Sequence, residues 1–277
     1  MDEKKISVIM GVYNCEDTVV DAIESILMQT YSNWELIICD DYSTDNTYEI
    51  LKQYKIEYPN KIVLLNNKIN CKLPYTLNKC LKYSSGNYIA RMDGDDISCN
   101  NRFEKQIGFL ESNPETDLVG TSMQRFDGKE VADILYSIQN PDKYTLKKRL
   151  PFNHATIMTY KKVYDKLNGY TVSKRTERCE DYDLWFRFFD KGFKGDNLIE
   201  PLYYVRENIN AIKRRTIKSR FNAYRTTIIG FRLLNYPLHW YIFPTIKMLF
   251  KVMVPTKLIL IYREYQNIKF SNKNEKI

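Results

Sequence analysis

Short apolar runs alternate with longer amphipathic stretches through the first hundred residues of this 277-residue chain. The apolar runs are four to six residues long and occupy positions 7–10, 34–39, 62–65 and 88–92. Between them, apolar side chains recur every three or four positions, which is the period of an amphipathic helix. Strands that alternate with helices predict an α/β fold, in which right-handed crossovers build a mostly parallel sheet flanked by helices.

Acidic residues follow two of the predicted strands, at the point where each strand ends. Asp40 and Asp41 come directly after the second apolar run. Asp93, Asp95 and Asp96 come directly after the fourth. Because the carboxyl ends of parallel strands lie along one edge of a sheet, where ligands collect, we expect these carboxylates to share one site.

The sequence DGDD at positions 93–96 concentrates three negative charges within four residues. Like charges this close repel one another, and a bound cation relieves the repulsion. Mn²⁺ and Mg²⁺ prefer oxygen ligands, and Mg²⁺ completes its shell with waters and substrate phosphates. The sequence therefore predicts a Mn²⁺ or Mg²⁺ site that also takes the diphosphate of a nucleotide. The alternative for DGDD taken alone is a solvated turn.

Five short sequence blocks follow one another along the chain. They are SVIMGVYN at 7–14, SILMQTY at 25–31, DDYSTD at 40–45, GNYIARMDGDD at 86–96 and EDYDLW at 180–185. In this order and spacing they strongly resemble the family 2 glycosyltransferases with a GT-A fold, over about residues 5–205. The resemblance implies a Rossmann-like nucleotide-diphospho-sugar transferase domain.

The resemblance also implies roles for residues on the donor side. Tyr13 corresponds to the residue that packs on the uracil base, and Asp41 to the carboxylate that hydrogen-bonds it. Asp93 corresponds to the ribose or diphosphate contact, and Asp95 to the ligand of Mn²⁺ or Mg²⁺. The expected donor is a nucleotide sugar, with UDP as the nucleotide.

On the acceptor side, Asp181 corresponds to the general base of the inverting members of the family. A carboxylate can take the proton of an acceptor hydroxyl as that hydroxyl attacks the sugar. Glu180, His154 and Trp185 are expected to contact the acceptor or the diphosphate. The alternatives are a helix first turn for Glu180, a structural role for His154 and core packing for Trp185. The QxxRW signature is absent after Leu184, which favours a single addition over processive synthesis.

The charge of the chain is unevenly distributed. Residues 206–277 hold 15 Lys and Arg against three Glu, a balance of +12, whereas the first 205 residues carry −4. Apolar residues from Ile217 onward recur at helical spacing, and the run between Pro244 and Pro255 is too short to span a bilayer. We therefore expect a GT-A catalytic domain at 1–205 and a basic amphipathic helical tail at 206–277 that lies on a membrane surface. The alternative is a tail that packs on the catalytic domain or forms a dimer contact.

The six cysteines are scattered without a regular framework, which is typical of reduced thiols in the cytoplasm. Together with the tail, this predicts a cytoplasmic protein that is peripheral on the inner face of the plasma membrane. The expected acceptor is a saccharide or lipid-linked saccharide in capsule, O-antigen or exopolysaccharide synthesis. The acidic catalytic region excludes nucleic acid as a partner, because phosphate binding needs clustered positive charge.

Two other functions compete with this interpretation. A sugar-phosphate nucleotidyltransferase shares an α/β nucleotide site, but it is expected to carry a basic glycine-rich loop after the first strand, where this chain has GVYNC at 11–15. A non-catalytic module that binds a membrane surface is the second alternative. Turnover of a nucleotide sugar discriminates between the three.

Overall fold

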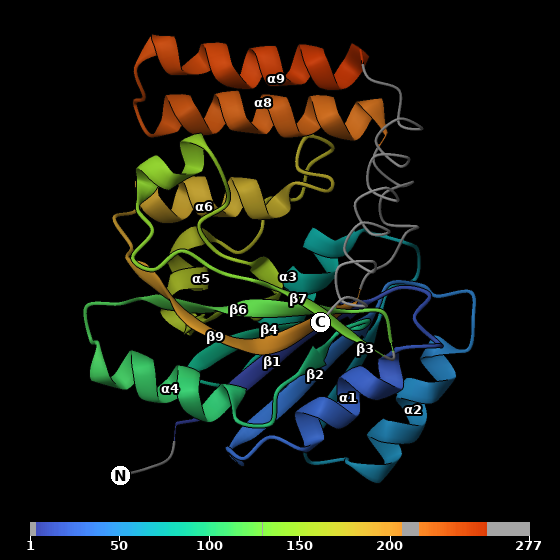
Figure 1. Cartoon of the computed structure of the whole chain (residues 1–277). Coiled ribbons are helices and arrows are strands. Elements are labelled where there is room, and N and C mark those ends of the chain that lie inside the picture. The colour runs from blue at the N-terminus through green and yellow to red at the C-terminus, as the bar shows by residue number, and fades with distance from the viewer. Residues whose placement is uncertain (1–3, 129, 207–215, 254–277) are drawn as a thin grey trace, which may run out of the picture.

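A computed structural model describes residues 4–128, 130–206 and 216–253, and these form helices around a single mixed sheet (Figure 1). The strands are β1 (Ile6–Val12), β2 (Trp34–Asp40), β3 (Ile62–Asn66), β4 (Tyr88–Asp93), β5 (Ile97–Ser98), β6 (Leu118–Phe126), β7 (Val131–Leu135), β8 (Met158–Tyr160) and β9 (Gly195–Arg206). The α-helices are α1 (Val19–Leu27), α2 (Thr47–Glu57), α3 (Leu73–Tyr83), α4 (Arg102–Ser112), α5 (Lys161–Leu167), α6 (Glu180–Asp190), α8 (Ile217–Leu233) and α9 (Ile242–Met253). Three short 3-10 helices are η1 (Lys143–Lys147), η2 (His154–Thr156) and η3 (Leu238–Tyr241).

The sheet has the strand order β3-β2-β1-β4-β8-β6-β9-β5, with β7 paired to β6. Its first four strands are parallel, as the alternation of strands and helices predicts. The short strand β8 then runs antiparallel to both β4 and β6. Since β6 and β9 pair in parallel, β8 is the element that joins the predicted parallel half to the second half of the sheet.

The two faces of the sheet carry separate hydrophobic cores because successive side chains of a strand point to opposite sides. In β1, Val8 and Met10 enter the core that α1 and α4 cover. The intervening residue, Ile9, enters the core that α3, α5 and α6 cover. Figure 1 shows these two helical layers on either side of the sheet. The predicted α/β fold with flanking helices is confirmed.

The described part of the predicted tail packs on the catalytic region. Helix α8 lies against α6, and α9 lies against α8, so the two form an outer layer at the top of Figure 1. Phe231 of α8 is fully buried and joins the core under α6. The rest of the predicted tail, at 207–215 and 254–277, lies outside the described residues.

Gly230 sets how closely α8 approaches α6. A Cβ atom at this position would lie 2.1 Å from the ring of Phe186, which is buried on α6. We therefore expect Gly230→Ala to lower the free energy of unfolding by about 1–3 kcal/mol, the usual effect of overpacking a core. Urea unfolding measures this change.

The matched control is Gly108→Ala on α4, where an added Cβ meets nothing within 4 Å. This substitution should leave stability unchanged or raise it by about 0.4–1 kcal/mol, because alanine restricts the unfolded chain more than glycine does. Equal effects at the two positions would contradict the proposed close packing of α8 on α6.

Candidate active site

The sheet register brings the two predicted acidic groups to the same edge. Strand β1 lies between β2 and β4, with Val12 opposite Asp40 and Gly11 opposite Asp93. Asp41 therefore follows one neighbour of β1, and the DGDD turn follows the other. The expected convergence at the carboxyl ends of these strands is present in the structure.

Hydrogen bonds hold the loops that follow these strands together. The backbone N–H of Asn14, after β1, donates to the Ser43 hydroxyl after β2 at 3.0 Å. The Thr18 hydroxyl, just before α1, donates to the carbonyl of Gly94 at 3.0 Å. Gly94 is required here, since a Cβ would lie 2.6 Å from a methyl group of Val12. The acidic turn thus closes directly onto the end of β1.

Asp93, Asp95 and Asp96 each present a carboxylate oxygen to one small volume. Their candidate ligand atoms all lie within 4.8 Å of one another. Asp96 is buried, and its pKa is raised well above its usual value by burial first and then by repulsion from Asp93 and Asp95. A divalent cation would relieve that repulsion, and these hard oxygen donors suit Mn²⁺ or Mg²⁺. The residues present therefore fit the predicted metal.

The end of β9 fixes the acidic turn from the opposite side. Arg206 donates its backbone N–H to the Asp96 carboxylate at 2.8 Å and its Nε to the Asp95 carbonyl at 2.9 Å. The hydroxyl oxygen of Tyr203 accepts the backbone N–H of Asp93 at 3.1 Å. Neither residue is predicted from the sequence, because neither belongs to a local motif and both meet the turn only through the pairing of β9.

Arg91 supplies a buried positive charge beneath the acidic turn. Its side chain is 2% exposed, and one guanidinium nitrogen lies 2.6 Å from an Asp93 oxygen. Burial disfavours the charged form, but the Asp93 carboxylate outweighs that effect and holds the pKa of Arg91 above its usual value. The ion pair fixes Asp93 while leaving its carboxylate partly exposed. Arg91, which precedes the turn on β4, thus anchors one of the three carboxylates of the turn.

The two residues predicted to contact the base lie on adjacent loops. Tyr13 directly follows β1 and is 46% exposed, so its ring is available to a planar ligand. Asp41 is buried, and its carboxylate accepts backbone N–H groups from Cys71 and Lys72 at 2.7 and 2.8 Å and the Asn67 side chain at 2.8 Å. Asp41 therefore also fixes the chain that leads into α3.

The first turn of α6 carries Glu180 and Asp181. Burial raises the pKa of Glu180 to about 7, repulsion from Asp181 adds to the shift, and Arg91 partly offsets it. Asp93 also acts on this carboxyl. The charges of Arg91 and Asp93 thus both act on the first turn of α6. That Asp181 serves as the base stays a prediction.

His154 lies in η2, and its ring packs against Trp185 of α6. Its Nε2 is 2.8 Å from the Tyr170 hydroxyl, and its pKa is lowered well below the usual value by burial and then by the charge of Arg91. The imidazole is therefore neutral, which suits a hydrogen bond to a hydroxyl better than a contact with a diphosphate.

Trp185 requires a correction to the sequence-based set. Its side chain has no exposed surface, and its ring packs against Phe152 and His154 at centroid distances of 5.1 and 6.0 Å. Trp185 belongs to the core on this side of the sheet. We therefore withdraw it from the residues expected to contact the acceptor.

The raised pKa of Glu180 predicts a pH-dependent stability. A pKa of about 7 in the folded protein against 4.5 for the free group means that the folded state favours the protonated carboxyl. The stability that the protonated Glu180 carboxyl contributes to the folded state is fully present below about pH 4.5 and is lost as the pH rises through 7. Glu180→Gln, which mimics the protonated form, should therefore gain stability relative to the wild type between pH 5 and pH 8.

Urea unfolding of the metal-free protein across that range measures the difference. The control is Glu115→Gln, an exposed carboxylate in the loop after α4. A constant difference between wild type and Glu180→Gln at every pH would contradict the raised pKa.

Comparison with known proteins identifies the family. The sequence profile described as Glycosyl transferase family 2 matches residues 7–167. The chain belongs to glycosyl transferase family 2. As a family 2 glycosyltransferase it is a transferase enzyme, which confirms the resemblance that the five sequence blocks carry.

Two relatives of this family 2 glycosyltransferase are similar over most of their length. EpsE of Bacillus subtilis (strain 168), named as a glycosyltransferase, is 46% identical over 273 residues, which cover 98% of this chain and 96% of EpsE. WfaP of Escherichia coli is named as a UDP-Glc:alpha-D-GlcNAc-diphosphoundecaprenol beta-1,3-glucosyltransferase. It is 32% identical over 203 residues, which cover 72% of this chain and 77% of WfaP.

The fold of this family 2 glycosyltransferase is shared with a solved structure. Residues 1–349 of TarS from S. aureus, crystallised with UDP-GlcNAc, superpose with a TM-score of 0.67 and 19% sequence identity, over 84% of this chain and 68% of the TarS chain. The likeness supports the GT-A architecture predicted from the sequence.

Proposed function

We propose that the chain is an inverting, metal-dependent glycosyltransferase that moves a sugar from a UDP-sugar to a saccharide or lipid-linked saccharide. The product would serve capsule, O-antigen or exopolysaccharide synthesis. The observation that carries the proposal is the meeting of the loop after β2 and the DGDD turn after β4 at the end of β1, with the ligand atoms of the three DGDD carboxylates within 4.8 Å of one another. The names of WfaP, which uses UDP-Glc, and of TarS in complex with UDP-GlcNAc support a UDP-linked donor.

The donor would lie across the carboxyl end of β1. Tyr13 would pack on the uracil, Asp41 would accept its N–H, and Asp93 would contact the ribose or the diphosphate. Asp95 would hold Mn²⁺ or Mg²⁺, and the metal, when bound, stabilises the charge that develops on the leaving diphosphate. The Asp93–Arg91 pair fixes one wall of this site before the donor arrives, so little reorganisation is needed on binding.

The acceptor would lie on the side of α6. Asp181 would take the proton of the acceptor hydroxyl as its oxygen attacks the anomeric carbon from the face opposite the diphosphate. A single displacement of this kind inverts the configuration, so an α-linked UDP-sugar gives a β-linkage. Glu180 and the neutral His154 would position acceptor hydroxyls by hydrogen bonds.

Release of UDP from a panel of UDP-sugars, with Mn²⁺ or Mg²⁺ present, tests the proposed function. We expect turnover of at least one donor, and mass spectrometry of the product identifies the transferred sugar. Release of pyrophosphate from UTP and a sugar phosphate would indicate a nucleotidyltransferase instead. No turnover with any nucleotide would favour the non-catalytic module.

We further propose that the protein works at the cytoplasmic surface of the plasma membrane, held there by α9 and η3. Within the described residues, no helix combines the length and apolar character needed to cross a bilayer. The exposed apolar residues Leu238, Ile242, Ile246 and Leu249 recur at helical spacing and are 84%, 59%, 59% and 55% exposed. Such a stripe suits a helix that lies in the membrane interface.

Substituting two residues of this stripe tests membrane binding. The double variant Ile246→Glu/Leu249→Glu should co-sediment with vesicles that contain anionic phosphatidylglycerol at least about tenfold less than the wild type, because each residue contributes apolar burial. Ile56→Glu on α2, where the side chain is 79% exposed, is the matched control. Equal co-sedimentation of all three proteins would contradict the proposed surface.

A further inference from the structure

Three described residues other than asparagine and glycine have a positive φ, and two of them flank Asp41. The three are Tyr42 (φ 65°), Lys72 (φ 71°) and Arg178 (φ 62°). Tyr42 follows Asp41 in the chain, and the backbone N–H of Lys72 donates to the Oδ2 atom of Asp41 at 2.8 Å. Positive φ is strained for a residue with a bulky side chain, and such strain clusters at functional sites. The strain thus concentrates around the carboxylate that is expected to contact the nucleotide base.

Lys72 has a backbone conformation that suits glycine. Its φ of 71° and ψ of 159° fall in a region that essentially only glycine occupies without strain. The residue is exposed, so packing of its side chain does not explain a lysine at this position. Within the part of the chain that the structure describes, its ammonium group has no hydrogen-bond or ion-pair partner. A residue that breaks a local rule in this way points to a function for its side chain.

Asp41 keeps one acceptor position open, on the oxygen that Lys72 holds. Its Oδ1 atom accepts two N–H groups, from the Asn67 side chain and from the backbone of Cys71. Its Oδ2 atom accepts the backbone N–H of Lys72 and no other group among the described residues. A carboxylate oxygen has two lone pairs, so Oδ2 can take one more N–H from a ligand. The N–H of a base bound by Asp41 would therefore lie directly beside Lys72.

The side chain of Lys72 is long enough to meet the neighbouring edge of such a base. A base nitrogen bound to Oδ2 would lie at most about 6 Å from the backbone nitrogen of Lys72, the length of two hydrogen bonds end to end. Lysine carries its three donors on a flexible four-carbon stem. The ammonium group can therefore donate to a carbonyl oxygen next to the N–H that Asp41 accepts.

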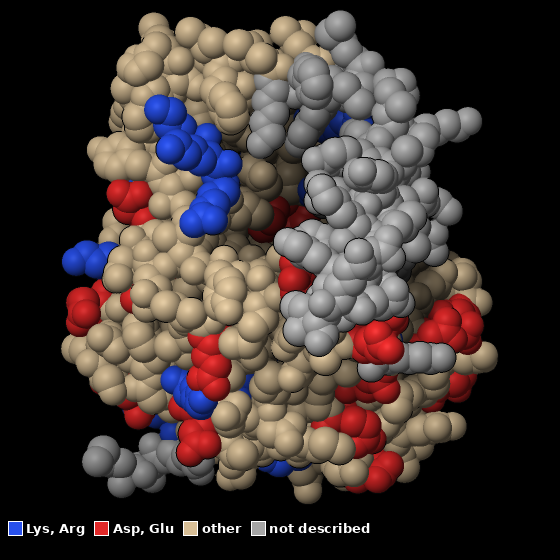
Figure 2. Space-filling model, viewed as in Figure 1, with Lys and Arg blue, Asp and Glu red and all other residues tan. Residues whose placement is uncertain are grey.

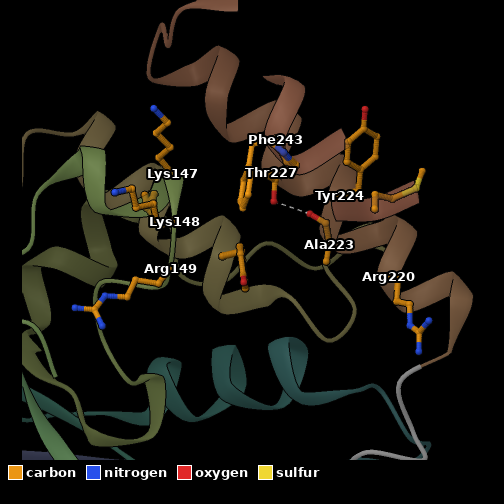
Figure 3. Close-up of a pocket in the computed structure, with 12 residues that line it drawn as sticks. Lys147, Lys148, Arg149, Arg220, Ala223, Tyr224, Thr227 and Phe243 are labelled. Carbon is orange, nitrogen blue, oxygen red and sulfur yellow. Dashed lines mark hydrogen bonds between the residues drawn. The ribbon is translucent and has the colours of Figure 1, made fainter. Parts of the chain in front are cut away.

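The basic side chains that cluster elsewhere offer no such donor to this site. Lys147 ends η1, and Lys148 and Arg149 follow it. Figure 2 shows Lys and Arg side chains at the surface over this segment, which is drawn light green in Figure 1. All three residues line a pocket beside α8, but Figure 3 shows their side chains pointing away from it. None of the three lies on a loop after β1, β2 or β4, whereas Lys72 belongs to the loop that Asp41 holds.

We propose that Lys72 selects the nucleotide of the donor by donating a hydrogen bond to a carbonyl oxygen of the base, beside the N–H that Asp41 accepts. Uracil presents this pair of groups. Cytosine presents an amino group and an unprotonated ring nitrogen instead, so both residues would face the wrong polarity. The inference rests on the proposed function for a UDP-linked donor, and it adds the residue that recognises the base.

Titration calorimetry of UDP in the presence of Mn²⁺ tests the contact without turnover. Lys72→Met keeps the length of the stem and removes the ammonium group. We expect it to bind UDP about tenfold more weakly than the wild type, because a hydrogen bond from a charged group is lost. The ratio of UDP affinity to CDP affinity should fall by about the same factor, since CDP makes no hydrogen bond with Lys72.

The matched control is Lys82→Met, which removes the same charge from the other end of α3. Its affinity for UDP should equal that of the wild type. An affinity of Lys72→Met within about twofold of the wild type, or equal losses in the two variants, would overturn the proposal.

Two analogues of UDP locate the hydrogen bond on the base. In 2-thio-UDP and 4-thio-UDP, sulfur, a weak acceptor, replaces one carbonyl oxygen of the uracil while its N–H remains. We expect one of the two analogues to bind the wild type about tenfold more weakly than UDP, and the loss to vanish in Lys72→Met, as for two groups in direct contact. No loss with either analogue, or equal losses in wild type and variant, would contradict the contact.

The variant Lys72→Gly separates the hydrogen bond from the backbone strain. Glycine relieves the strain, so the midpoint of thermal unfolding should rise by about 2–4 °C. The affinity for UDP should nevertheless fall as far as in Lys72→Met. If Lys72 served only the structure of the loop, the glycine variant would bind UDP at least as well as the wild type, and the proposal would be wrong.

Turnover distinguishes a failure of this contact from a failure of the proposed function. With a UDP-sugar that the wild type turns over, Lys72→Met should raise the KM for the donor about tenfold and leave kcat unchanged, as expected for a contact equal in ground and transition states. An unchanged KM would refute the role of Lys72 and leave the transferase activity intact. A wild type that neither binds UDP nor releases it from any UDP-sugar would refute both.

Discussion

The variant Asp95→Asn is expected to lose about a hundredfold or more of the metal-dependent rate of UDP release. The substitution keeps the size of the side chain but replaces a charged oxygen ligand with a neutral amide. Asp95 shares one small volume with Asp93 and Asp96, so removing its charge also lowers the repulsion that raises the pKa of Asp96. Fewer negative charges bind a divalent cation more weakly, and the leaving diphosphate loses its stabilisation, which is worth several kcal/mol.

Calorimetric titration with Mn²⁺ in the presence of UDP gives a readout that is independent of turnover. We expect Mn²⁺ affinity to fall in parallel with the rate, and EDTA to reduce the wild type to the rate of the variant. Asp190→Asn, an exposed carboxylate at the end of α6, should behave as the wild type. Turnover by Asp95→Asn within a few-fold of the wild type would exclude Asp95 as a metal ligand.

The variant Asp181→Asn is expected to lower kcat by about 10²–10⁴-fold, the usual contribution of a general base. The amide keeps the shape of the first turn of α6 but cannot accept the proton of the acceptor hydroxyl. Donor binding should stay the same, because in the proposed complex the donor would lie at the end of β1 and would meet α6 only through the reacting sugar. The split between an unchanged KM for the donor and a reduced kcat separates a lost base from a misfolded site.

The same control, Asp190→Asn, lies on the same helix about two and a half turns away and should keep full activity. Acceptor-independent hydrolysis of the donor provides a second check, because water needs less positioning than a saccharide. If Asp181→Asn retained kcat while Glu180→Gln lost it, the base would be Glu180, whose pKa of about 7 also suits proton transfer near neutral pH.

The parallel half of the fold follows from the sequence. The predicted strand at 34–39 ends within one residue of β2, and the run at 62–65 within one residue of β3. The acidic residues Asp41 and Asp93 then fall where parallel strands end. Local hydrophobic period and strand length carry this information, because both depend only on neighbouring residues.

The second half of the sheet does not follow from the sequence in the same way. Strand β8 has only three residues and runs antiparallel between β4 and β6, where no periodic pattern marks it. The burial of Trp185 likewise depends on Phe152, which lies more than thirty residues earlier in the chain. Contacts of this kind require the packed arrangement of elements, and a single sequence does not contain it.

The sequence by itself determined the elements of the first half of the sheet, the carboxylates at the strand ends and the amphipathic character of the helices that follow. Each of these features depends only on residues that are close together in the chain. Only the tertiary structure decided that Arg206 holds the acidic turn, across 110 residues of sequence, and that α8 packs on α6 at Gly230. Local periodicity fixes which face of an element is apolar, whereas shape and charge complementarity between distant elements fix which faces meet.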